Sequence, residues 1–185
     1  MKPIYLRNVP PPTETFDHIN LLEWFAVWVK PERYLELGVR DGKCFTKIAP
    51  LCKEAIAVDI IDPVFSLTDN MKYEKMYTDS YFAKIKDLNL KFDMVFIDAD
   101  HSHEQSYKDF LNVKDLVIED GFVFFHDSYP YSKELLDPNY CNDCYKTPIK
   151  IKELFLNEWE IVTLPFNPGV TICKKIYNKN GLPWM

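Results

Sequence analysis

The chain has 185 residues, 47% of them apolar, which supports one hydrophobic core and argues against two full domains. Its 22 Lys and Arg face 28 Asp and Glu, a formal net charge of −6, and no basic run could follow a phosphate backbone. This composition excludes nucleic acid as the default partner and is too apolar for a disordered chain. We expect a single domain over residues 1–185, in which residues 1–30 form an N-terminal arm and helix.

The sequence shows no signal for export or for a membrane span. The first residues lack a continuous apolar stretch, and no segment reaches the about 18 apolar residues that suggest a span. The five cysteines are odd in number and scattered, so we expect reduced thiols, a cytoplasmic location and no membrane partner. Cys141 and Cys144 have the spacing of half a zinc site or a redox pair, but no second pair of ligands follows them, and we favour a loop that covers the site.

The N-terminal part predicts an extended arm and then a helix. Pro10, Pro11 and Pro12 favour extended chain, after which apolar residues from Leu22 to Val29 follow helical spacing up to Pro31. Seven short apolar segments then predict strands, at residues 33–39, 55–61, 75–79, 92–100, 121–127, 160–166 and 170–176.

The pattern of these strands predicts an α/β fold. Four strands are almost continuously apolar, around Leu35, Val58, Val95 and Val123. Such runs are typical of a parallel sheet covered on both faces, and residues 41–54 and 103–118 supply crossover helices. The connection at 165–169 is too short for a parallel crossover and predicts a hairpin. We expect a Rossmann-like, doubly wound, seven-stranded and mostly parallel sheet of five βα-type units with an antiparallel C-terminal hairpin.

The turn after the first strand is a candidate ligand site, because ligands of such sheets bind beyond the carboxyl ends of the strands. Gly38 and Gly42 lie in this turn, where missing side chains let a ligand approach the backbone. A tight turn without a ligand explains the two glycines equally well. Arg40 stands where a dinucleotide-binding motif needs a second glycine, which argues against an NAD-dependent oxidoreductase.

The second strand ends in an acidic residue at a characteristic distance from the first. Asp59 lies 23 residues after Glu36, the spacing at which a carboxylate accepts hydrogen bonds from both hydroxyls of a ribose. The alternative is that Asp59 only caps the next turn, beside Pro63.

The fourth and fifth strands end in acidic and imidazole groups. Asp98, Asp100 and His101 close the fourth strand, and His126 and Asp127 close the fifth. Such groups are costly at the end of an apolar strand unless they are solvated, paired or bound to a cation. If the strands are neighbours, Asp98, His126 and Asp127 converge on one divalent ion, Mg²⁺ or Mn²⁺. The alternative is that they cap the following helices.

Five segments in this order resemble one known family. ELGVRDG, AVDII, YTDS, FIDADHSHEQSYKDF and DGFVFFHDS are similar to motifs of class I S-adenosylmethionine-dependent methyltransferases, over about residues 30 to 176. The nearest pattern is that of a small group with DGDHSYE and GG-HD motifs, related to macrolide-sugar and caffeoyl-CoA O-methyltransferases. The resemblance implies S-adenosylmethionine as cofactor and O-methylation of a small hydroxylated acceptor, a sugar or a phenol.

The resemblance also assigns residues to roles. The cofactor would be bordered by Glu36, Gly38, Gly42, Asp59, Asp79, Ser80, Asp98 and Asp100. Asp98, His126 and Asp127 would hold the metal, and His101 would be the catalytic base, although a surface histidine is an equal alternative for His101. Two positions depart from the family pattern: His126 replaces an acidic residue, and Asp120 replaces the first glycine of the GG pair.

Two further questions stay open at the level of the sequence. The aromatic segment from Tyr129 to Tyr145 is the expected wall of an acceptor pocket, but it does not identify the acceptor. Aromatic residues in the N-terminal arm leave a homo-oligomer open. The alternative function is a non-catalytic accessory protein that binds S-adenosylmethionine or a metal.

Overall fold

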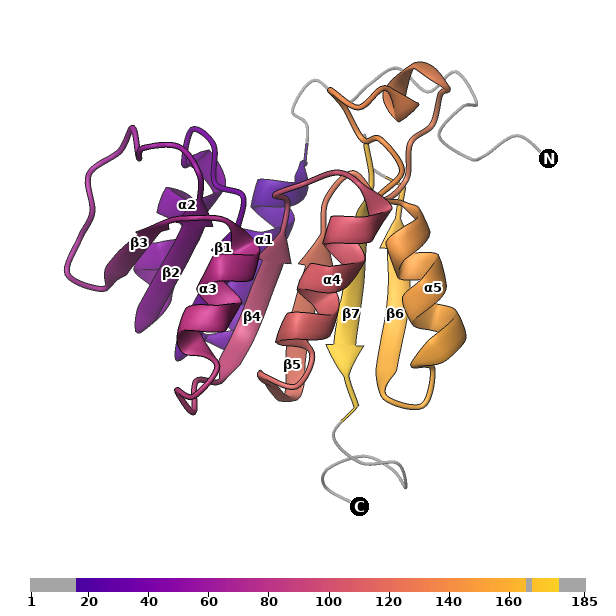
Figure 1. Ribbon diagram of the computed structural model, residues 1–185. Coiled ribbons are helices and arrows are strands. Elements are labelled where there is room, and N and C mark those ends of the chain that lie inside the picture. The colour runs from indigo at the N-terminus through magenta and orange to yellow at the C-terminus, as the bar shows by residue number, and fades with distance from the viewer. Residues whose placement is uncertain (1–15, 166–167, 177–185) are drawn as a thin grey trace.

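The computed structural model describes residues 16–165 and 168–176, which form one seven-stranded sheet with helices on both faces (Figure 1). The strands are β1 (Arg33–Leu37), β2 (Glu54–Asp59), β3 (Met71–Lys75), β4 (Phe92–Ile97), β5 (Val117–Phe125), β6 (Trp159–Leu164) and β7 (Val170–Lys175). The helices are α1 (His18–Val29), α2 (Lys43–Ile48), α3 (Thr78–Ile85), α4 (His103–Val113) and α5 (Lys146–Leu154), with 3₁₀ turns η2 (Ala49–Leu51) and η3 (Glu134–Leu136). No helix among these residues is both long and apolar enough to cross a membrane.

The sheet has the strand order β3-β2-β1-β4-β5-β7-β6. The first five of these strands are parallel, and β7 runs antiparallel to both of its neighbours, β5 and β6. Val162 lies opposite Ile172 in the closing pair. The predicted fold class and the predicted hairpin are therefore confirmed. Residues 166 and 167 of the hairpin connection lie outside the described residues, as does the predicted arm at Pro10 to Pro12.

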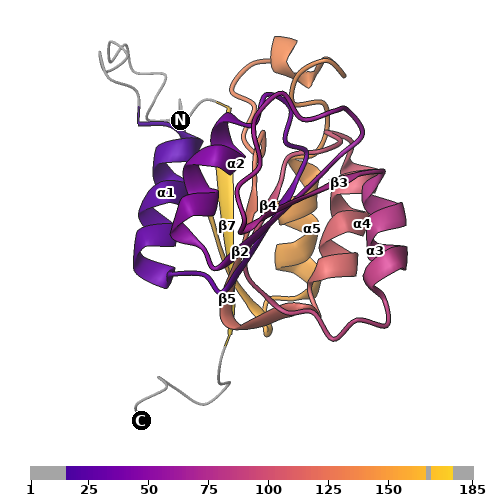
Figure 2. The ribbon, with the colours of Figure 1, turned by 90° about the vertical axis from the view of Figure 1, so that its left-hand side faces the viewer.

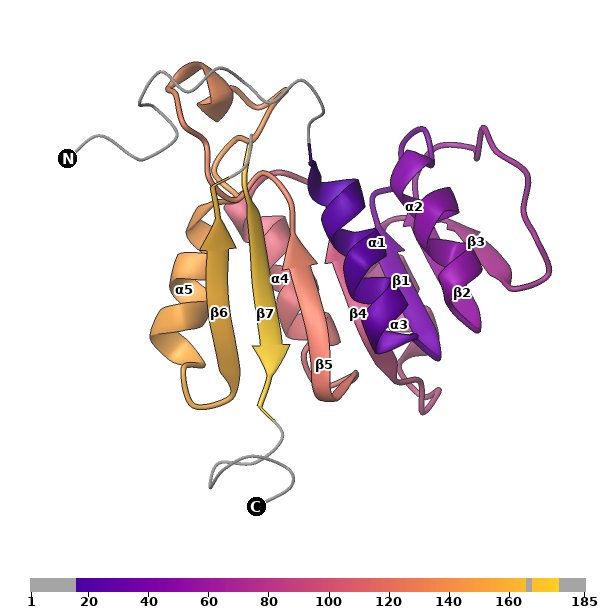
Figure 3. The ribbon, with the colours of Figure 1, turned by 180° about the vertical axis from the view of Figure 1, so that it is seen from behind.

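Side chains that alternate along each strand build two cores. Tyr34 belongs to the core beneath α1 and α2, whereas Leu35 and Leu37 belong to the core beneath α3, α4 and α5. Figure 2 shows these two helix layers edge-on, and Figure 3 shows α1 and α2 from behind. Because helices cover both faces, the ends of the strands are the first place to look for a ligand site.

Helix α1 begins and ends at local signals in the sequence. The Asp17 carboxylate accepts a hydrogen bond from the Asn20 N–H at 3.0 Å, and the Asn20 side chain accepts one from the Asp17 N–H at 3.2 Å. This reciprocal pair satisfies two N–H groups that the first turn leaves free. Lys30, with a φ of 50°, and then Pro31 end the helix, as the sequence predicted.

The third strand was predicted at the wrong place. The prediction put it at residues 75–79, but β3 covers Met71–Lys75, and Thr78 and Asp79 begin α3. The strand pairs only with β2, at the edge of the sheet, so most of its side chains stay polar and its apolar signal is weak.

The prediction of five βα-type units is also wrong, since helices follow only β1, β3, β4 and β5 in the described residues. Residues 60–70 join β2 to β3 without a helix, and Phe65 of this segment packs on Phe45 and Tyr73. The predicted crossover helix at 103–118 is shorter than expected, because its last residues, from Val117, already belong to β5.

Candidate active site

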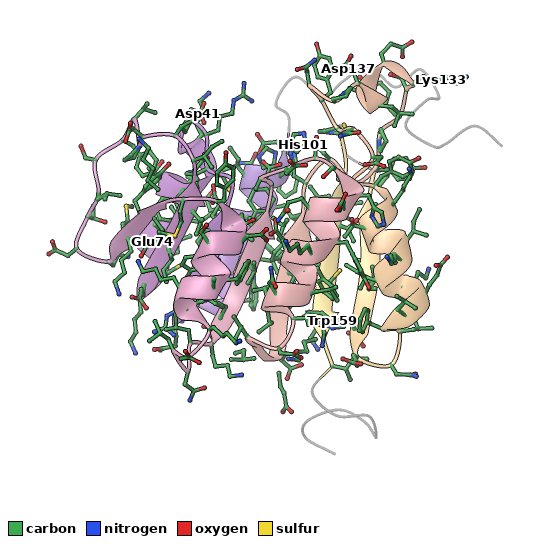
Figure 4. All side chains as sticks on the ribbon, viewed as in Figure 1. Asp41, Glu74, His101, Lys133, Asp137 and Trp159 are labelled. Atoms are coloured by element: carbon green, nitrogen blue, oxygen red, sulfur yellow. The ribbon has the colours of Figure 1, made fainter. Side chains whose placement is uncertain are left out.

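A cavity of about 940 Å³ opens at the carboxyl ends of β1, β2, β4 and β5. This volume is typical of sites for small molecules. The predicted site residues that line it are Glu36, Gly38, Asp59, Asp79, Asp98, Asp100, His101, His126 and Asp127. Figure 4 labels His101 at this edge of the sheet and Trp159 at the opposite one. Topology thus brings together nearly all of the residues singled out from the sequence.

Glu36 is a buried acid at the end of β1. Its side chain is 1% exposed, and its Oε2 accepts a hydrogen bond from the Tyr34 hydroxyl at 2.6 Å. Burial penalises the charged form and raises the pKa of Glu36 to about 8. A cationic group that entered the cavity beside Glu36 would restore its charge.

The two glycines of the first turn serve close contacts within the chain. Both have a positive φ, 81° at Gly38 and 76° at Gly42. A Cβ at Gly38 would lie 2.3 Å from the Asp98 carbonyl oxygen, and one at Gly42 would lie 2.2 Å from the ring of Phe65. Gly38 still lines the cavity, but the space beside Gly42 is filled by Phe65, and the role of Gly42 at a cofactor stays a prediction.

Asp59 holds the same turn by its carboxylate. Its Oδ2 accepts hydrogen bonds from the N–H groups of Val39 and Arg40, at 2.7 and 2.8 Å, and its Oδ1 accepts one from the Ile61 N–H at 3.2 Å. A carboxylate has about four acceptor positions, so about one is left. Only the bond to Ile61 lies in the next turn, which the alternative named, while the other two hold the turn after β1. The role of Asp59 at a ribose stays a prediction.

The start of α3 forms another part of the wall. Asp79 lines the cavity and binds Lys108 at 2.6 Å, whereas Ser80 is exposed and lies outside the lining. The sequence analysis missed Tyr77, a lining residue whose side chain is 70% exposed. A signal was present, since an aromatic residue directly before a helix at this edge of the sheet is available to a planar ligand.

Two acids and two histidines form a cluster between β4 and β5. His101 Nε2 lies 3.1 Å from Asp127 Oδ2 and 3.6 Å from Asp98 Oδ1. His126 Nδ1 lies 3.1 Å from Asp98 Oδ1 and 3.5 Å from Asp127 Oδ2. The convergence of Asp98, His126 and Asp127 that the sequence suggested is therefore present, and His101 belongs to the same group.

The cluster members shift one another's pKa. Hydrogen bonding to Asp98 is the largest cause that raises the pKa of His101 to about 9. Burial alone would lower the pKa of His126, but the nearby charge of Asp98 and hydrogen bonds to both acids outweigh burial and raise this pKa to about 10. Burial alone would raise the pKa of Asp98, yet the two imidazoles lower it to about 2. At neutral pH both histidines are therefore in the positively charged imidazolium form, with a proton on each ring nitrogen.

The donor set also suits a divalent ion. Asp98, His101 and Asp127 each offer one ligand atom, and the three atoms lie within 4.8 Å of one another. Carboxylate oxygen and imidazole nitrogen together are typical ligands of Mn²⁺ and later transition metals. His126 also faces both acids, and the His18 ring lies against it, with ring centroids 4.1 Å apart and an angle of 50° between the ring planes.

The segment after β5 closes over this cluster. The Tyr140 carbonyl oxygen pairs with His101 Nδ1, and Cys141 Sγ lies 3.5 Å from Asp127 Oδ1. Cys144 Sγ donates to the Asp127 carbonyl oxygen at 3.2 Å. Both cysteines are free and buried, in agreement with the favoured reading of a covering loop.

Comparisons with known proteins bear on this geometry. The model of a family described as a methyltransferase domain matches residues 35–128, just over half of the chain. The match runs from within β1 to just beyond the end of β5 and includes the whole cluster. No curated protein sequence matches the chain at a significant level.

Solved structures of low identity share the fold. A candidate caffeoyl-CoA O-methyltransferase from Staphylococcus aureus has a TM-score of 0.69 at 13% identity, covering 89% of this chain and 86% of that one. The O-methyltransferase TomG from Streptomyces achromogenes, in complex with S-adenosylmethionine, gives 0.68 at 14%, covering 88% and 81%. An O-methyltransferase from Bacillus cereus, in complex with S-adenosylhomocysteine, gives 0.63 at 12%, covering 91% and 84%.

The family match covers the strands that carry the candidate site, and the fold is that of these methyltransferase structures. Both findings confirm the resemblance seen in the sequence. The chain therefore belongs to the family described as a methyltransferase domain.

Proposed function

We propose that this chain transfers a methyl group from S-adenosylmethionine to a hydroxyl oxygen of a small acceptor, such as a sugar or a phenol. The observation that carries the proposal is one cavity of about 940 Å³ that joins Glu36 and Asp59 to the cluster of Asp98, His101 and Asp127. The match to a methyltransferase domain supports methyl transfer as the reaction. The carboxylate and imidazole groups of the cluster suit an acceptor hydroxyl.

The residues of the cavity fit the cofactor. Glu36 and Asp98 offer carboxyl groups to a cationic amino group, and Asp59 keeps about one acceptor position for a ribose hydroxyl. Ile61 and Tyr77 offer an apolar and aromatic surface to a planar base. S-adenosylmethionine supplies a methyl group on a sulfonium, and its transfer requires an acceptor oxygen held in line with the bond that breaks.

The cluster gives the acceptor hydroxyl its environment. A divalent ion held by Asp98, His101 and Asp127, with His126 beside it, would lower the pKa of that hydroxyl. In the ion-free protein His101 has a pKa of about 9 and holds its proton at neutral pH. Its two N–H groups face the Tyr140 carbonyl oxygen and the Asp127 carboxylate, so His101 becomes a base for the acceptor only when it has lost the proton on Nε2.

Cofactor binding is tested by calorimetry with S-adenosylhomocysteine. We expect micromolar affinity, and Asp59→Ala should weaken it by about 1–3 kcal/mol, because charge-assisted hydrogen bonds are lost. Asp62→Ala is the matched control, since it removes an exposed carboxylate of the neighbouring turn, outside the cavity. Wild type that shows no heat at millimolar ligand would remove the cofactor from the proposal, and binding without turnover on any hydroxylated acceptor would favour the accessory protein.

Metal binding is tested with Mn²⁺ alone, by the loss of the electron paramagnetic resonance signal of the free ion. We expect binding that Asp127→Asn weakens about tenfold or more, because one anionic ligand is lost. Asparagine tolerates the φ of 54° at this position, so the backbone should persist. Asp137→Asn, on the exposed turn that Figure 4 labels, is the control. If wild type and Asp127→Asn bind Mn²⁺ equally and turnover survives chelation, the proposed metal site is wrong. The mechanism would then be metal-free.

A further inference from the structure

A second cavity of about 720 Å³ lies on the other side of the segment 128–145, between that segment, α5 and β6. Its lining shares no residue with the lining of the first cavity. Three tyrosines and two lysines characterise it: Tyr129, Tyr131, Tyr145, Lys133 and Lys152. We call it the tyrosine–lysine cavity.

The walls of the tyrosine–lysine cavity suit a flat, apolar ligand. The three tyrosines supply aromatic surface from the segment, and Ile149 of α5 and Ile161 of β6 supply aliphatic surface. Aromatic rings pack favourably against planar ligands, in offset-stacked or edge-to-face arrangements. The volume is that of a site for one small molecule.

The charge of the tyrosine–lysine cavity is opposite to that of the chain. The net charge of the whole sequence is −6, yet two lysines and no Asp or Glu line the tyrosine–lysine cavity. Lys133 and Lys152 form no ion pair with other residues of the described part of the chain, whereas lysines such as Lys108 and Lys146 do. Along the chain, three acids directly follow lining residues, at Glu134, Asp137 and Glu153.

Hydroxyl groups add polar contacts to the lining. Ser128 and Thr163 both line the tyrosine–lysine cavity and are joined through Thr171. Thr163 Oγ1 lies 2.8 Å from Thr171 Oγ1, which in turn donates to Ser128 Oγ at 2.9 Å. Because Thr171 donates to Ser128, Thr163 donates to Thr171, and Ser128 donates to the Phe125 carbonyl oxygen at 3.5 Å. These hydroxyl hydrogens are used within the chain, so an anionic group in the tyrosine–lysine cavity pairs with the two ammonium groups.

We propose that the tyrosine–lysine cavity binds a small aromatic anion, a ring that bears a phosphate or carboxylate group. The ring lies among the tyrosines and the aliphatic side chains, and the anionic group pairs with Lys133 and Lys152. The proposal does not depend on methyl transfer. It does bear on the first cavity, because the same segment contacts His101 through Tyr140 and Asp127 through Cys141.

The test uses phenyl phosphate and isoleucine-methyl NMR of the full chain. Ile149 and Ile161 report on the tyrosine–lysine cavity, and Ile60 and Ile61 report on the first cavity. We expect millimolar phenyl phosphate to shift the signals of Ile149 and Ile161 in a saturable manner and to leave those of Ile60 and Ile61 in place. Shifts confined to Ile60 and Ile61, or no shift at all, would overturn the proposal.

Variants and simpler probes separate the two parts of the ligand. Replacing both lysines, Lys133→Gln with Lys152→Gln, should weaken phenyl phosphate about tenfold, since two ion pairs near the surface are lost. Lys86→Gln with Lys53→Gln, at two exposed positions outside the tyrosine–lysine cavity, should leave the affinity unchanged. Benzyl alcohol and inorganic phosphate should each bind more weakly than phenyl phosphate. Equal affinity in both double variants, or equal binding of inorganic phosphate, contradicts an aromatic-anion site.

Discussion

At the scale of single residues, the candidate site compensates its charges internally. The sequence suggested that Asp98 and Asp127 at neighbouring strand ends would be costly without a cation. The structure places His101 and His126 against these two acids. Because the pKa values of both histidines are raised, their protonated rings provide the positive charge. A metal ion that binds here has to displace protons, so pH decides between the two forms of the cluster.

Glu36 makes the stability of the fold depend on pH. Its pKa is raised from 4.5 to about 8 in the folded chain, so between these values the folded state holds a proton that the unfolded state has lost. The free energy of unfolding therefore falls as pH rises through this window, by up to about 1.4 kcal/mol per pH unit. Glu36→Gln keeps an acceptor for the Tyr34 hydroxyl and removes this dependence. In urea unfolding of the cofactor-free proteins, the free energy of unfolding of Glu36→Gln should rise relative to that of wild type from pH 5 to 8.

The control for this prediction is Glu119→Gln, which removes an exposed carboxylate of β5. Its stability should run parallel to that of wild type over the same range. The buried Asp109, with a pKa that burial raises to about 6, stays present in all three proteins and cancels in the comparison. A constant difference between Glu36→Gln and wild type would show that Glu36 is ionised throughout.

At the scale of elements, the turn between β1 and α2 depends on the segment that replaces a crossover helix. Gly42→Ala would place a Cβ within 2.2 Å of the Phe65 ring, at a φ of 76°. We expect a loss of about 2–4 kcal/mol, the sum of left-handed strain and overpacking. Denaturant unfolding measures it.

A double-mutant cycle separates these two contributions. Phe65→Leu replaces the ring that fills the space beside Gly42 by a smaller side chain. Gly42→Ala should therefore lower the free energy of unfolding less in the Phe65→Leu background than in wild type, by about 1 kcal/mol or more. Additive effects of the two substitutions would mean that Phe65 does not pack on Gly42.

The sequence predicted what periodic patterns specify. Apolar runs located the central strands, and topology then placed Asp98 and His126 at one edge. The edge strand at Met71–Lys75 was misplaced because its apolar signal is weak. Residues 60–70 form no helix and instead pack Phe65 on Phe45 and Tyr73, a tertiary contact that no local pattern specifies. The contacts of Tyr140 and Cys141 with the cluster depend on the path of an irregular segment, which no local pattern encodes.

At the scale of the whole molecule, two cavities share one wall. The segment 128–145 contributes Tyr140 and Cys141 to the first cavity and Tyr131 and Tyr145 to the tyrosine–lysine cavity. Figure 1 shows this segment projecting above the sheet, away from the two helix layers. Ligands on its two sides therefore act on the same piece of backbone.

The position of β7 sets the order in which the sheet can assemble during synthesis. Within the described residues β6 pairs only with β7, and β7 is the last strand in the chain although it lies inside the sheet. A nascent chain that has reached residue 169 therefore has an open edge on β5 and a β6 without a partner. β7 has six residues, and at about 5–20 residues per second their synthesis takes about 0.3–1 s, during which this edge stays open. During that interval the apolar strand β5 is available to other nascent chains, which makes this step the one at which aggregation competes with folding.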